Sequence, residues 1–515
     1  MNKILFAALA SATLAFTSCA DDFLDRQPQG SYVDNEQTAS AKDWNPQVLL
    51  GNINACSSKM VMWAGGDDQS HFGQKFLDMC GDIMTGDIVK SSNGYGWFTP
   101  AFVRTNSVIS SDDNDYTWKY CYQLIKSANQ VFDDSGSDVE EPESAENKFY
   151  WAVAKTIRAY AYMNLINFYS GSYDEYKETR CVPVYRTQIN QTPAPKQTVD
   201  SVYNLVKMDL TQAITAYENS GLRTSDLTMP TINVARTLLA YAYLNTGKYA
   251  QAADMAALAF NSDSHQILPA NQVLTTGFNS VSNNANNWMW GIDVTAEITG
   301  GLATFWGHMD PYTYSYASVG DFMCINDTLF KTIPQNDIRR QWFVGDEEFQ
   351  YFAGMFGNAN ALAASNKFFD SKRSWQGDAL WTNDVVYMRA EEPVLIAAEA
   401  YTRNGDLNNG RVWLRKLLEQ RDAEGVNGTL ADTVNTMSTA EKLLDAIYFN
   451  WRVEMWGEGR SLMTMRRFKA TNAIGSNTYI LTDRNTNISY NDKSIIFVIP
   501  QSEINSNKNL DKVEN

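Results

Sequence analysis

The sequence predicts a mainly α-helical fold, built from tetratricopeptide-like helix pairs and interrupted by one long loop-rich insert. Three observations lead to this prediction. Apolar residues recur every three or four positions in long stretches, two helix–turn–helix segments share the same spacing of small and large residues, and residues 262–385 have no helical period. The chain therefore reads as a helical scaffold on both sides of a loop-rich insert.

The first helix pair is expected at about 150–217. In residues 150–168, Ala154, Ile157 and Ala161 continue to Leu165 and Phe168 at spacings of three and four, which is one apolar face of a helix. Residues 199–217 follow the same pattern, and the Pro-containing stretch "QTPAPKQTV" separates the two helices.

Two further pairs are predicted at 235–260 and 392–421, and a fourth at about 440–468. In 235–260, small residues alternate with aromatic ones around a central glycine, and such small positions let two antiparallel helices approach closely. The second segment repeats these offsets: Ala398, Tyr401, Gly405, Leu407 and Gly410 match Ala240, Tyr243, Gly247, Tyr249 and Ala252.

The N-terminus has the layout of a lipoprotein signal peptide. Lys3 precedes the apolar run "ILFAALASATLAF", which is shorter than the ~20 residues of a membrane-spanning helix. The run ends at Thr17-Ser18-Cys19, which resembles a bacterial lipobox. We expect residues 1–18 to be removed and Cys19 to carry the lipid, because several acyl chains on one residue anchor a protein firmly.

Composition excludes some functions. The formal net charge is −17, whereas a protein that binds nucleic acid needs a basic surface. Nucleic-acid binding is therefore not predicted. The six cysteines are scattered without a Cys-x-x-Cys pair, so neither a zinc site nor a disulfide framework is predicted. With Cys19 lipidated, five cysteines are left, and at least one buried free thiol is expected.

The sequence contains little that points to catalysis. It has three histidines without a metal-ligand neighbour, and no nucleophile elbow, phosphate-binding loop or His-Glu-x-x-His motif. A glycosidase needs only two carboxylates at the right separation, so that alternative stays open. Residues 110–116, "SSDDNDY", offer oxygen ligands for calcium, but they lack EF-hand spacing and favour a solvated acidic turn. No cofactor is therefore predicted.

Five motifs, in order, resemble the SusD/RagB family of lipid-anchored nutrient-uptake proteins. The resemblance covers nearly the whole mature chain, and any one motif by itself is weak. The matching segments are Cys19 with "DDFLDRQPQG", "TIRAYAYMNLINFYSG" followed by "VPV", "YMRAEEPVLIAAEAYTRNGD", "RVEMWGEGRSLMTMRRF" and "FVIPQSEINSNKNL". Within them, Glu458 and Arg460 are expected to pair within or beside their own helix and to stabilise the architecture rather than contact ligand.

The resemblance implies a location and a role. It implies a non-catalytic protein, lipid-anchored and exposed on the surface of a Gram-negative outer membrane. Such a protein covers a SusC-like TonB-dependent transporter and delivers oligosaccharides to it, with the helical side toward the transporter. It also implies an N-terminal part at 19–261 and a C-terminal part at 262–515, packed as one unit.

Two aromatic loops are the predicted binding surface. Trp and Tyr rings stack on the C–H faces of sugars, and Asn and Asp side chains bind hydroxyl groups. The first loop, 91–98, follows the segment "CGDIMTGDIV", where the resemblance places the rim of the family's site; the second, 288–316, is the richest aromatic stretch. The candidate residues are Asn93, Tyr95, Trp97, Trp306, Asp310, Tyr312 and Tyr314.

The cargo stays open at this level. Some relatives bind peptides, and a long cleft that bonds backbone groups needs little side-chain selectivity. A surface glycosidase is a third possibility. For each aromatic side chain, burial in the core is the competing interpretation, because most tryptophans are largely buried.

Overall fold

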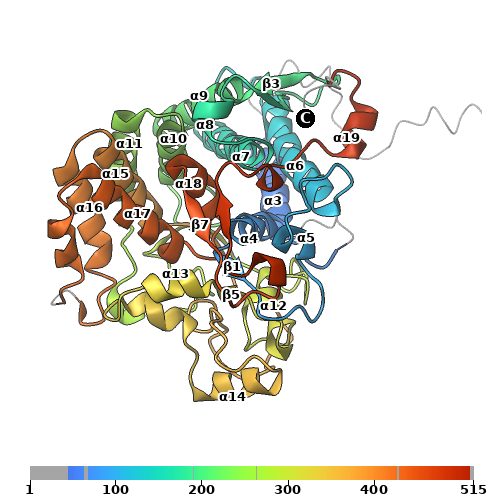
Figure 1. Cartoon of the computed structure of the whole chain (residues 1–515). Coiled ribbons are helices and arrows are strands. Elements are labelled where there is room, and N and C mark those ends of the chain that lie inside the picture. The colour runs from blue at the N-terminus through green and yellow to red at the C-terminus, as the bar shows by residue number, and fades with distance from the viewer. Residues whose placement is uncertain (1–44, 63–67, 190, 263, 426–427, 511–515) are drawn as a thin grey trace, which may run out of the picture. The chain divides into compact units, whose positions relative to one another are not determined.

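The computed structural model describes residues 45–62, 68–189, 191–262, 264–425 and 428–510 (Figure 1). In these residues helices dominate and strands are short, so the mainly α-helical prediction is confirmed. The leader and Cys19 lie outside the described residues. The longer helices are α3 (Pro46–Val61), α4 (Gln74–Met84), α6 (Asp112–Asp134), α7 (Ala145–Tyr169), α9 (Val199–Ser220), α10 (Ile232–Asn245), α11 (Tyr249–Asn261), α14 (Glu347–Met355), α15 (Glu391–Arg403), α16 (Leu407–Leu418), α17 (Ala440–Glu454) and α18 (Ser461–Phe468).

The remaining elements are shorter. They include four antiparallel strand pairs, β1 with β5, β2 with β3, β4 with β6 and β7 with β8. The short helices are α5 (Thr99–Phe102), α8 (Tyr173–Tyr176), α12 (Phe305–Met309), α13 (Asp327–Thr332) and α19 (Gln501–Ser506), and the strands are β1 (Ile88–Val89), β2 (Arg180–Pro183), β3 (Lys196–Thr198), β4 (Trp288–Ile292), β5 (Cys324–Ile325), β6 (Val385–Arg389), β7 (Thr471–Ala473) and β8 (Asn487–Ser489).

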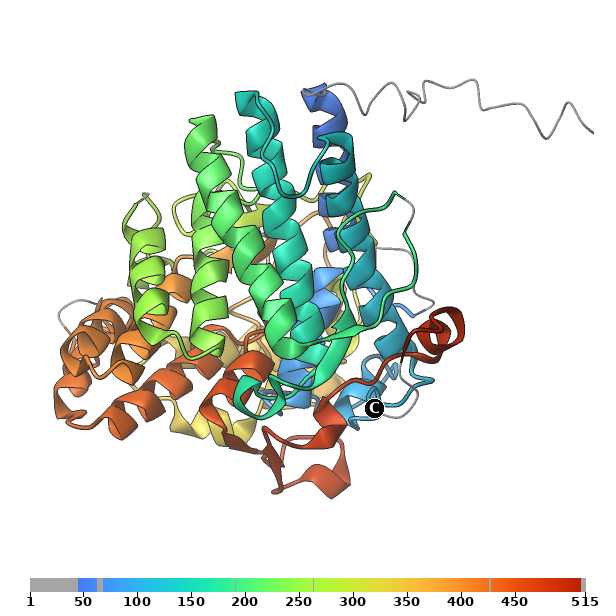
Figure 2. The same cartoon turned by 90° about the horizontal axis from the view of Figure 1, so that it is seen from above.

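The predicted helix pairs form one continuous row. Helices α6, α7, α9, α10 and α11 each pack against the next, and α11 packs in turn against α15, which contacts α16 and α17 (Figures 1 and 2). The pairs expected from the sequence correspond to α7 with α9, α10 with α11, α15 with α16 and α17 with α18. Helix α3 packs against α6 and α7 and extends the row at its N-terminal side, and α4 contacts α3.

Small residues make the close helix contacts, as their spacing predicted. Ala240, Ala252 and Ala256 are fully buried between α10 and α11. Gly247 turns the chain between these helices with φ +74°, a left-handed conformation that favours glycine. At Gly410 an added Cβ would lie 2.2 Å from Thr402 Oγ1, so only glycine allows α15 and α16 to approach this closely.

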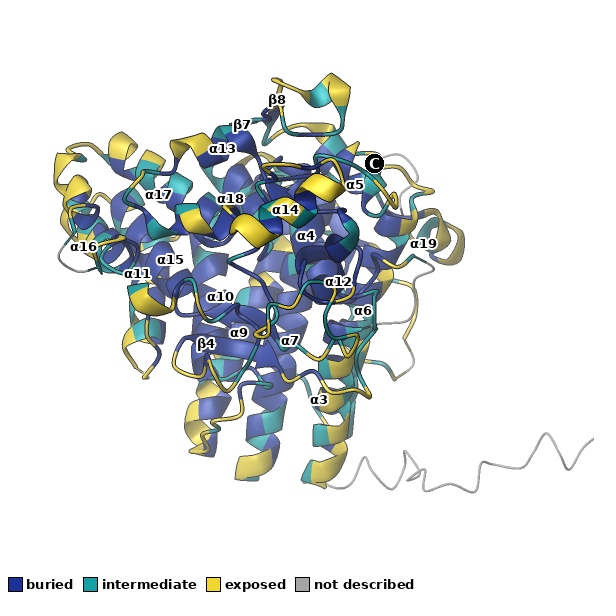
Figure 3. Ribbon diagram, turned by 90° about the horizontal axis from the view of Figure 1, so that it is seen from below, coloured by how far each residue is buried: buried dark blue, intermediate teal, exposed yellow. Residues whose placement is uncertain are grey.

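The insert leaves the row after α11 and returns to it at α15. Strand β4 near its start pairs antiparallel with β6 at its end, with Ile292 opposite Val385. Between them the chain runs through the short helices α12 and α13 and the longer helix α14. In Figure 3, α12 and α14 lie on the side of the molecule that faces the viewer, and much of α14 is exposed. The insert thus builds one face of the molecule from irregular backbone.

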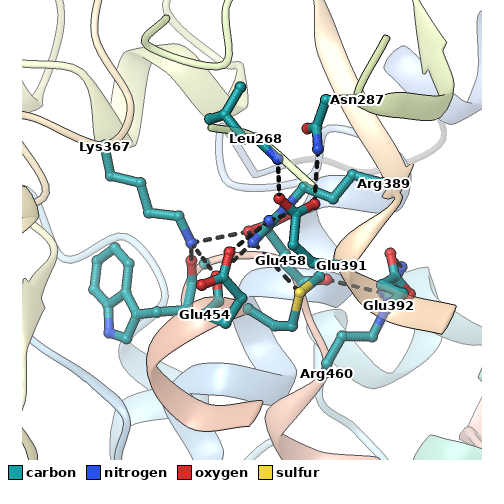
Figure 4. A network of polar contacts seen from close by, with 12 residues as sticks. Leu268, Asn287, Lys367, Arg389, Glu391, Glu392, Glu454, Glu458 and Arg460 are labelled. Carbon is teal, nitrogen blue, oxygen red and sulfur yellow. Dashed lines mark hydrogen bonds and ion pairs between the residues drawn. The ribbon is translucent and has the colours of Figure 1, made fainter. Parts of the chain in front are cut away.

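A buried ionic network joins the end of the insert to the C-terminal helices (Figure 4). Glu454 accepts hydrogen bonds from three guanidinium groups, those of Arg339, Arg389 and Arg421, at 2.7–3.2 Å. Four cations face four carboxylates, so the network is formally neutral, and each side chain is at most 4% exposed: Arg339, Lys367, Arg389, Arg421, Asp337, Glu391, Glu454 and Glu458.

The network corrects the expected pairing of Glu458 and Arg460. Glu458 pairs with Lys367 and Arg389 at 2.8 Å, and Arg460 pairs with Glu392 at 2.8 Å. All these ion-pair partners come from other segments, so the charges connect elements that are far apart in sequence. The local bond between the two residues is that from Arg460 Nη1 to the backbone oxygen of Glu458, at 2.9 Å. Because these side chains are almost fully buried, their role is architectural and they do not form a ligand surface.

Candidate functional site

The predicted loop 91–98 lies against the insert. Strand β1 precedes the loop and pairs with β5 in register, Val89 opposite Cys324. Lys90 Nζ, fully buried, is 2.7 Å from Asp321 Oδ2 and anchors the start of the loop. The pKa of Lys90 is lowered by burial, which Asp321 offsets only in part. Two segments that are more than two hundred residues apart in sequence therefore meet at this loop.

Polar side chains fix the shape of the loop. Asn93 Nδ2 donates to Thr99 Oγ1 at 3.1 Å, and Asn93 Oδ1 accepts from the Gly96 N–H at 3.1 Å. Ser91 Oγ donates to Asn358 Oδ1 at 2.8 Å. The predicted hydroxyl partner Asn93 is thus already engaged in bracing the loop and is half-buried. Its expected role as a ligand contact stays a prediction.

Tyr95 and Trp97 lean on a ring of the insert. The ring centroid of Tyr316 lies 5.0 Å from that of Tyr95 and 5.6 Å from that of Trp97. Tyr95 is 51% exposed, Trp97 is half-buried, and Tyr316 is buried beneath them. His308 stacks on the inner side of Tyr316 at 5.1 Å. Both rings are therefore supported by Tyr316; Tyr95 is open to solvent, and Trp97 is open only in part because it also packs against the core.

His308 supports these rings as a neutral group. It is buried, and its Nε2 lies 3.1 Å from the backbone oxygen of Gln69. Burial, together with the charge of Lys90, lowers the pKa of His308 to about 3. The histidine is therefore uncharged at neutral pH, and the ring stack carries no charge that titrates there.

A second group of rings lies next to the first. Phe352 and Trp375 stack in parallel with centroids 4.4 Å apart, and Phe356 lies 6.4 Å from Trp375. The turn 318–321 separates the two groups: the backbone oxygen of Gly320 accepts from Ser92 and Asn358, and a Cβ on Gly320 would lie 2.5 Å from Phe356. We call Tyr95, Trp97, Phe352, Phe356 and Trp375 the aromatic face.

The sequence reasoning missed the second group. Phe352 and Phe356 are four residues apart at the end of α14, on a side that leaves Phe356 40% exposed, while Phe349 and Ala353 point to the core. That i, i+4 spacing of two aromatic residues was the signal that could have revealed them. Trp375 lies in an irregular segment and has no such signal.

Three of the predicted ligand residues are buried, which corrects the expectation that they face solvent. Trp306 is 2% exposed and donates from Nε1 to the backbone oxygen of Asp384 at 3.2 Å. Tyr312 is 3% exposed. Asp310 is fully buried and accepts from the Tyr312 N–H, the Thr313 hydroxyl and the Asp370 N–H. For these three residues, burial in the core is the correct interpretation.

Tyr314, from the same stretch, is 49% exposed. Its backbone oxygen accepts from Trp381 Nε1 at 2.8 Å, so its position is fixed by the main chain and its ring is free to contact a ligand. Of the seven candidates, Tyr95 and Trp97 come together, and Tyr314 is exposed without a ring contact to them among the described residues.

Burial raises the pKa of several carboxyl groups, including those of Asp113, Asp134 and Asp384. Asp82 and Asp310 have a pKa raised as far as a catalytic acid would need, but neither of these two carboxyl groups is accessible. Burial raises the pKa of both Asp82 and Asp310 to about 7. Asp82 is fully buried and accepts from the N–H groups of Gly457, Gly459 and Ser461. These acids therefore hold loops in place, and the structure offers no support for a glycosidase pair built on them.

The acidic stretch at 110–116 differs from the expected solvated turn. Its aspartates form the first turn of α6, and Asp113 is buried with its Oδ1 3.1 Å from His71 Nε2. The described residues contain no group of three or more His, Cys, Asp or Glu side chains that could hold a metal ion. The five cysteines of the described residues are buried and free, as expected for at least one of them.

Two family models match the chain. The SusD family matches residues 326–515, and a family described as "Starch-binding associating with outer membrane" matches residues 35–244. No curated protein sequence matches the chain.

Several solved structures share the fold. A SusD-like carbohydrate-binding protein from Bacteroides vulgatus is 22% identical, with 91% of this chain and 98% of that chain covered and a TM-score of 0.70. A SusD superfamily protein from Bacteroides thetaiotaomicron is 19% identical, with 91% and 99% covered and a TM-score of 0.71. Surface glycan-binding protein A from Bacteroides thetaiotaomicron, solved with laminarihexaose, is 17% identical, with 90% and 98% covered and a TM-score of 0.64.

Proposed function

Because the chain belongs to the SusD/RagB family, we propose that it is a non-catalytic surface lipoprotein that binds oligosaccharides and delivers them to a SusC-like TonB-dependent transporter. The aromatic face is the observation that carries this proposal. A protein in solution usually buries its large rings, so rings held open on a supported platform indicate a binding surface.

The chemistry of the aromatic face suits sugars. A pyranose ring presents a patch of C–H groups, and an aromatic ring presents an apolar face with a partial negative charge that attracts them. Tyr95 and Trp97 supply such faces on one side of the turn 318–321, and Phe356 and Trp375 supply them on the other. Two groups of rings side by side suit an oligosaccharide better than a single sugar.

Replacing Tyr95 and Trp97 by alanine tests the proposal. Each lost stacking contact is expected to remove ~1–3 kcal/mol, by analogy with bases stacked on aromatic side chains. Since ~1.4 kcal/mol is a factor of ten, each single variant should bind its oligosaccharide about tenfold more weakly, as measured by isothermal titration calorimetry. A panel of neutral oligosaccharides, laminarihexaose among them, provides the ligand.

The control is Tyr401→Ala, which removes a half-buried ring from α15, outside the aromatic face. It should leave the affinity unchanged. Unchanged affinity in the folded Tyr95→Ala and Trp97→Ala variants would show that the glycan binds elsewhere. Binding of peptides but of no oligosaccharide would favour the alternative cargo, and turnover of a bound glycan would contradict the non-catalytic role.

The proposed anchor is tested at Cys19, which lies outside the described residues. No helix of the described segments is long and apolar enough to cross a bilayer. Cys19→Ala should therefore shift the protein from the membrane fraction to the soluble fraction, because the variant can no longer receive the acyl chains. Protease treatment of intact cells then reports surface exposure, and continued tight membrane association of the variant would contradict the lipid anchor.

The helical row is the side we propose to face the transporter, with the aromatic face turned to the ligand. Co-purification tests this orientation. The transporter should co-purify with the wild-type protein but not with a variant altered along the row.

A further inference from the structure

A pocket of about 370 Å³ lies between α6, the segments 185–188 and 191–193, and α19 near the end of the chain. Helices α6 and α19 lie beside each other in Figures 1 and 3. The volume of the pocket falls within the ~300–1,000 Å³ that is usual for small-molecule sites. None of its lining residues belongs to the aromatic face. The pocket is therefore a separate candidate for ligand binding.

Hydrogen bonds hold two walls of the pocket together. Asn507, just after α19, donates from Nδ2 to the backbone oxygen of Ala194 at 2.9 Å and to Glu503 Oε1 at 3.0 Å. Asn509 Nδ2 donates to the backbone oxygen of Pro193 at 2.5 Å. The end of the chain is thus fastened to the segment 191–194. The pocket is therefore already formed before a ligand enters, which lowers the cost of binding.

Two tyrosine rings form a corner in the pocket, which we call the tyrosine corner. The rings of Tyr122 and Tyr185 stand at 73° to each other with centroids 5.8 Å apart, and both residues are half-buried. Trp118, which is 4% exposed, backs Tyr122 at 4.8 Å. The Tyr122 hydroxyl donates to the backbone oxygen of Pro183 at 2.7 Å. The Tyr185 hydroxyl accepts from the Ala194 N–H at 3.2 Å. Both rings are therefore held in place while part of each stays accessible.

Three long polar side chains of the pocket are free to bind a ligand. Gln123 and Lys126 come from α6, and Gln191 comes from the segment 191–193. Gln123 is half-buried, and Lys126 and Gln191 are exposed. None of the three forms a hydrogen bond or an ion pair with another described residue. Their two amides and one ammonium group are therefore both accessible and unpaired.

The charges that line the pocket balance one another. Lys119 is paired with Asp115 on its own helix. The charges that are left are those of Lys126 and Glu503, which have opposite sign and form no ion pair with each other among the described residues. Burial raises the pKa of Tyr185, and the nearby charge of Glu503 raises it further, so this carboxylate lies close to the tyrosine corner. A pocket without net charge suits an uncharged ligand better than an ion.

We propose that this pocket binds a neutral sugar unit, with the sugar ring against the tyrosine corner and its hydroxyl groups bonded to Gln123, Lys126 and Gln191. Aromatic rings offer an apolar face to the C–H groups of a sugar. A sugar hydroxyl both donates and accepts, which matches amides that do the same, an ammonium group that donates and the Glu503 carboxylate that accepts.

A peptide is the weaker candidate for this pocket. Extended peptides are bound chiefly through main-chain groups at a strand edge, whereas the unpaired groups of this pocket belong to side chains. The inference goes beyond the proposed function, because it adds a second point of attachment that does not need the aromatic face. Two sites on one chain would raise the apparent affinity for a long polysaccharide through multivalency.

The test uses the full mature chain with Tyr95→Ala and Trp97→Ala, so that the aromatic face does not contribute. The neutral probes are the methyl glycosides of glucose, galactose, mannose and xylose, and D-glucuronate and trialanine are the charged and peptide probes. Ligand-observed NMR titration should show binding of at least one methyl glycoside. Its affinity should not change between about 50 and about 500 mM NaCl, because salt screens only interactions between charges.

Single substitutions assign this binding to the pocket. Gln123→Ala and Lys126→Ala should each weaken binding about three- to tenfold, the effect of one lost hydrogen bond. Both variants should keep the melting temperature of their parent, because neither side chain bonds to the rest of the protein. The matched control is Gln130→Ala, which removes an amide about two turns further along α6, outside the pocket, and should leave the affinity unchanged.

Hydrogen exchange locates the bound sugar without any substitution in the pocket. The backbone N–H groups of α19 and of 191–194 should exchange more slowly when the methyl glycoside is present, because the ligand holds the two walls together. The N–H groups of loop 91–98 should exchange at an unchanged rate.

Three results would overturn the proposal. The first is that none of the four methyl glycosides binds. The second is binding that responds to neither Gln123→Ala nor Lys126→Ala. The third is tighter binding of D-glucuronate or trialanine, which would assign the pocket to an anion or a peptide. If the unmutated chain then still bound oligosaccharides through Tyr95 and Trp97, the proposed function would stand and only the second site would be wrong.

Discussion

Replacement of Glu454 by glutamine is expected to lower the free energy of unfolding by about 3–5 kcal/mol, the cost of removing one partner from a buried ion pair. Glu454 is fully buried and holds Arg339, Arg389 and Arg421 around its carboxylate at 2.7–3.2 Å. Without this charge, the neutral network keeps an uncompensated positive charge in the core. Urea unfolding of the wild type and the variant measures the difference.

The matched control is Asp432→Asn, which breaks an ion pair with Arg415 at the surface. The Asp432 side chain is 62% exposed and that of Arg415 is 33% exposed, so the loss should stay below about 1 kcal/mol. If Glu454→Gln lowered the free energy of unfolding by a similarly small amount, the buried network would stabilise the fold no more than a surface ion pair does.

Acid should weaken the same network. Burial alone would raise the pKa of Glu458, but Arg389 and Lys367 outweigh it and bring the pKa to about 2. The pKa of Glu454 likewise lies well below its usual value, because three arginines outweigh its burial. A carboxyl group with a lowered folded-state pKa stabilises the fold above its unfolded-state pKa of ~4.5 and loses that contribution as the pH falls toward 2. The stability difference between the wild type and Glu454→Gln should therefore narrow between pH 4.5 and pH 2.

Replacement of Trp306 by alanine is expected to destabilise the protein by about 3–5 kcal/mol, the range for removing a large aromatic side chain from a core. The ring is 2% exposed, packs edge-on against Phe305 at 5.5 Å and hydrogen-bonds to the backbone of Asp384. The variant loses this packing and leaves a backbone oxygen without its donor. The melting temperature of Trp306→Ala should fall clearly. At temperatures where this variant is still folded, it should bind the oligosaccharide with the affinity of the wild type.

Tyr314→Ala is the control from the same segment. Its ring is 49% exposed, and the hydrogen bond from Trp381 reaches its backbone oxygen, which alanine also provides. Its stability should change by no more than about 0.5 kcal/mol, as for most surface substitutions. An unchanged melting temperature in Trp306→Ala, together with weaker glycan binding, would restore Trp306 as a ligand contact and contradict the burial argument.

The sequence by itself determined the helical row. A helix repeats every 3.6 residues, so the periodic apolar positions of 150–168 and the matching offsets of Ala240 and Ala398 predicted the helices and their pairing. The offset glycines Gly247 and Gly405 both lie in the turns between paired helices, with φ +74° and +87°. Local rules are sufficient for these elements because their neighbours in space are also their neighbours in sequence.

The sequence also predicted two of the five residues of the aromatic face, Tyr95 and Trp97. Loop 91–98 was predicted from its glycines and aromatic residues. Tyr95 is exposed there and Trp97 is half-buried, and their contact with a ligand stays a prediction. Glu458 and Arg460 were expected to pair within or beside their own helix. Their partners Lys367 and Glu392 lie more than sixty residues away, a distance in sequence that helical spacing cannot predict.

Only the tertiary structure decided which rings of the insert face solvent. Trp306 lies in the short helix α12 and Tyr314 in the irregular segment that follows, eight residues later, yet one is 2% exposed and the other 49%. A helix of five residues and irregular backbone give no repeated period that could predict the direction of a side chain, and what covers each ring comes from a distant segment. The backbone oxygen of Asp384 accepts a hydrogen bond from Trp306. Gln69, near the other end of the chain, hydrogen-bonds to both Tyr316 and His308. Burial there depends on contacts between segments that only the folded chain brings together.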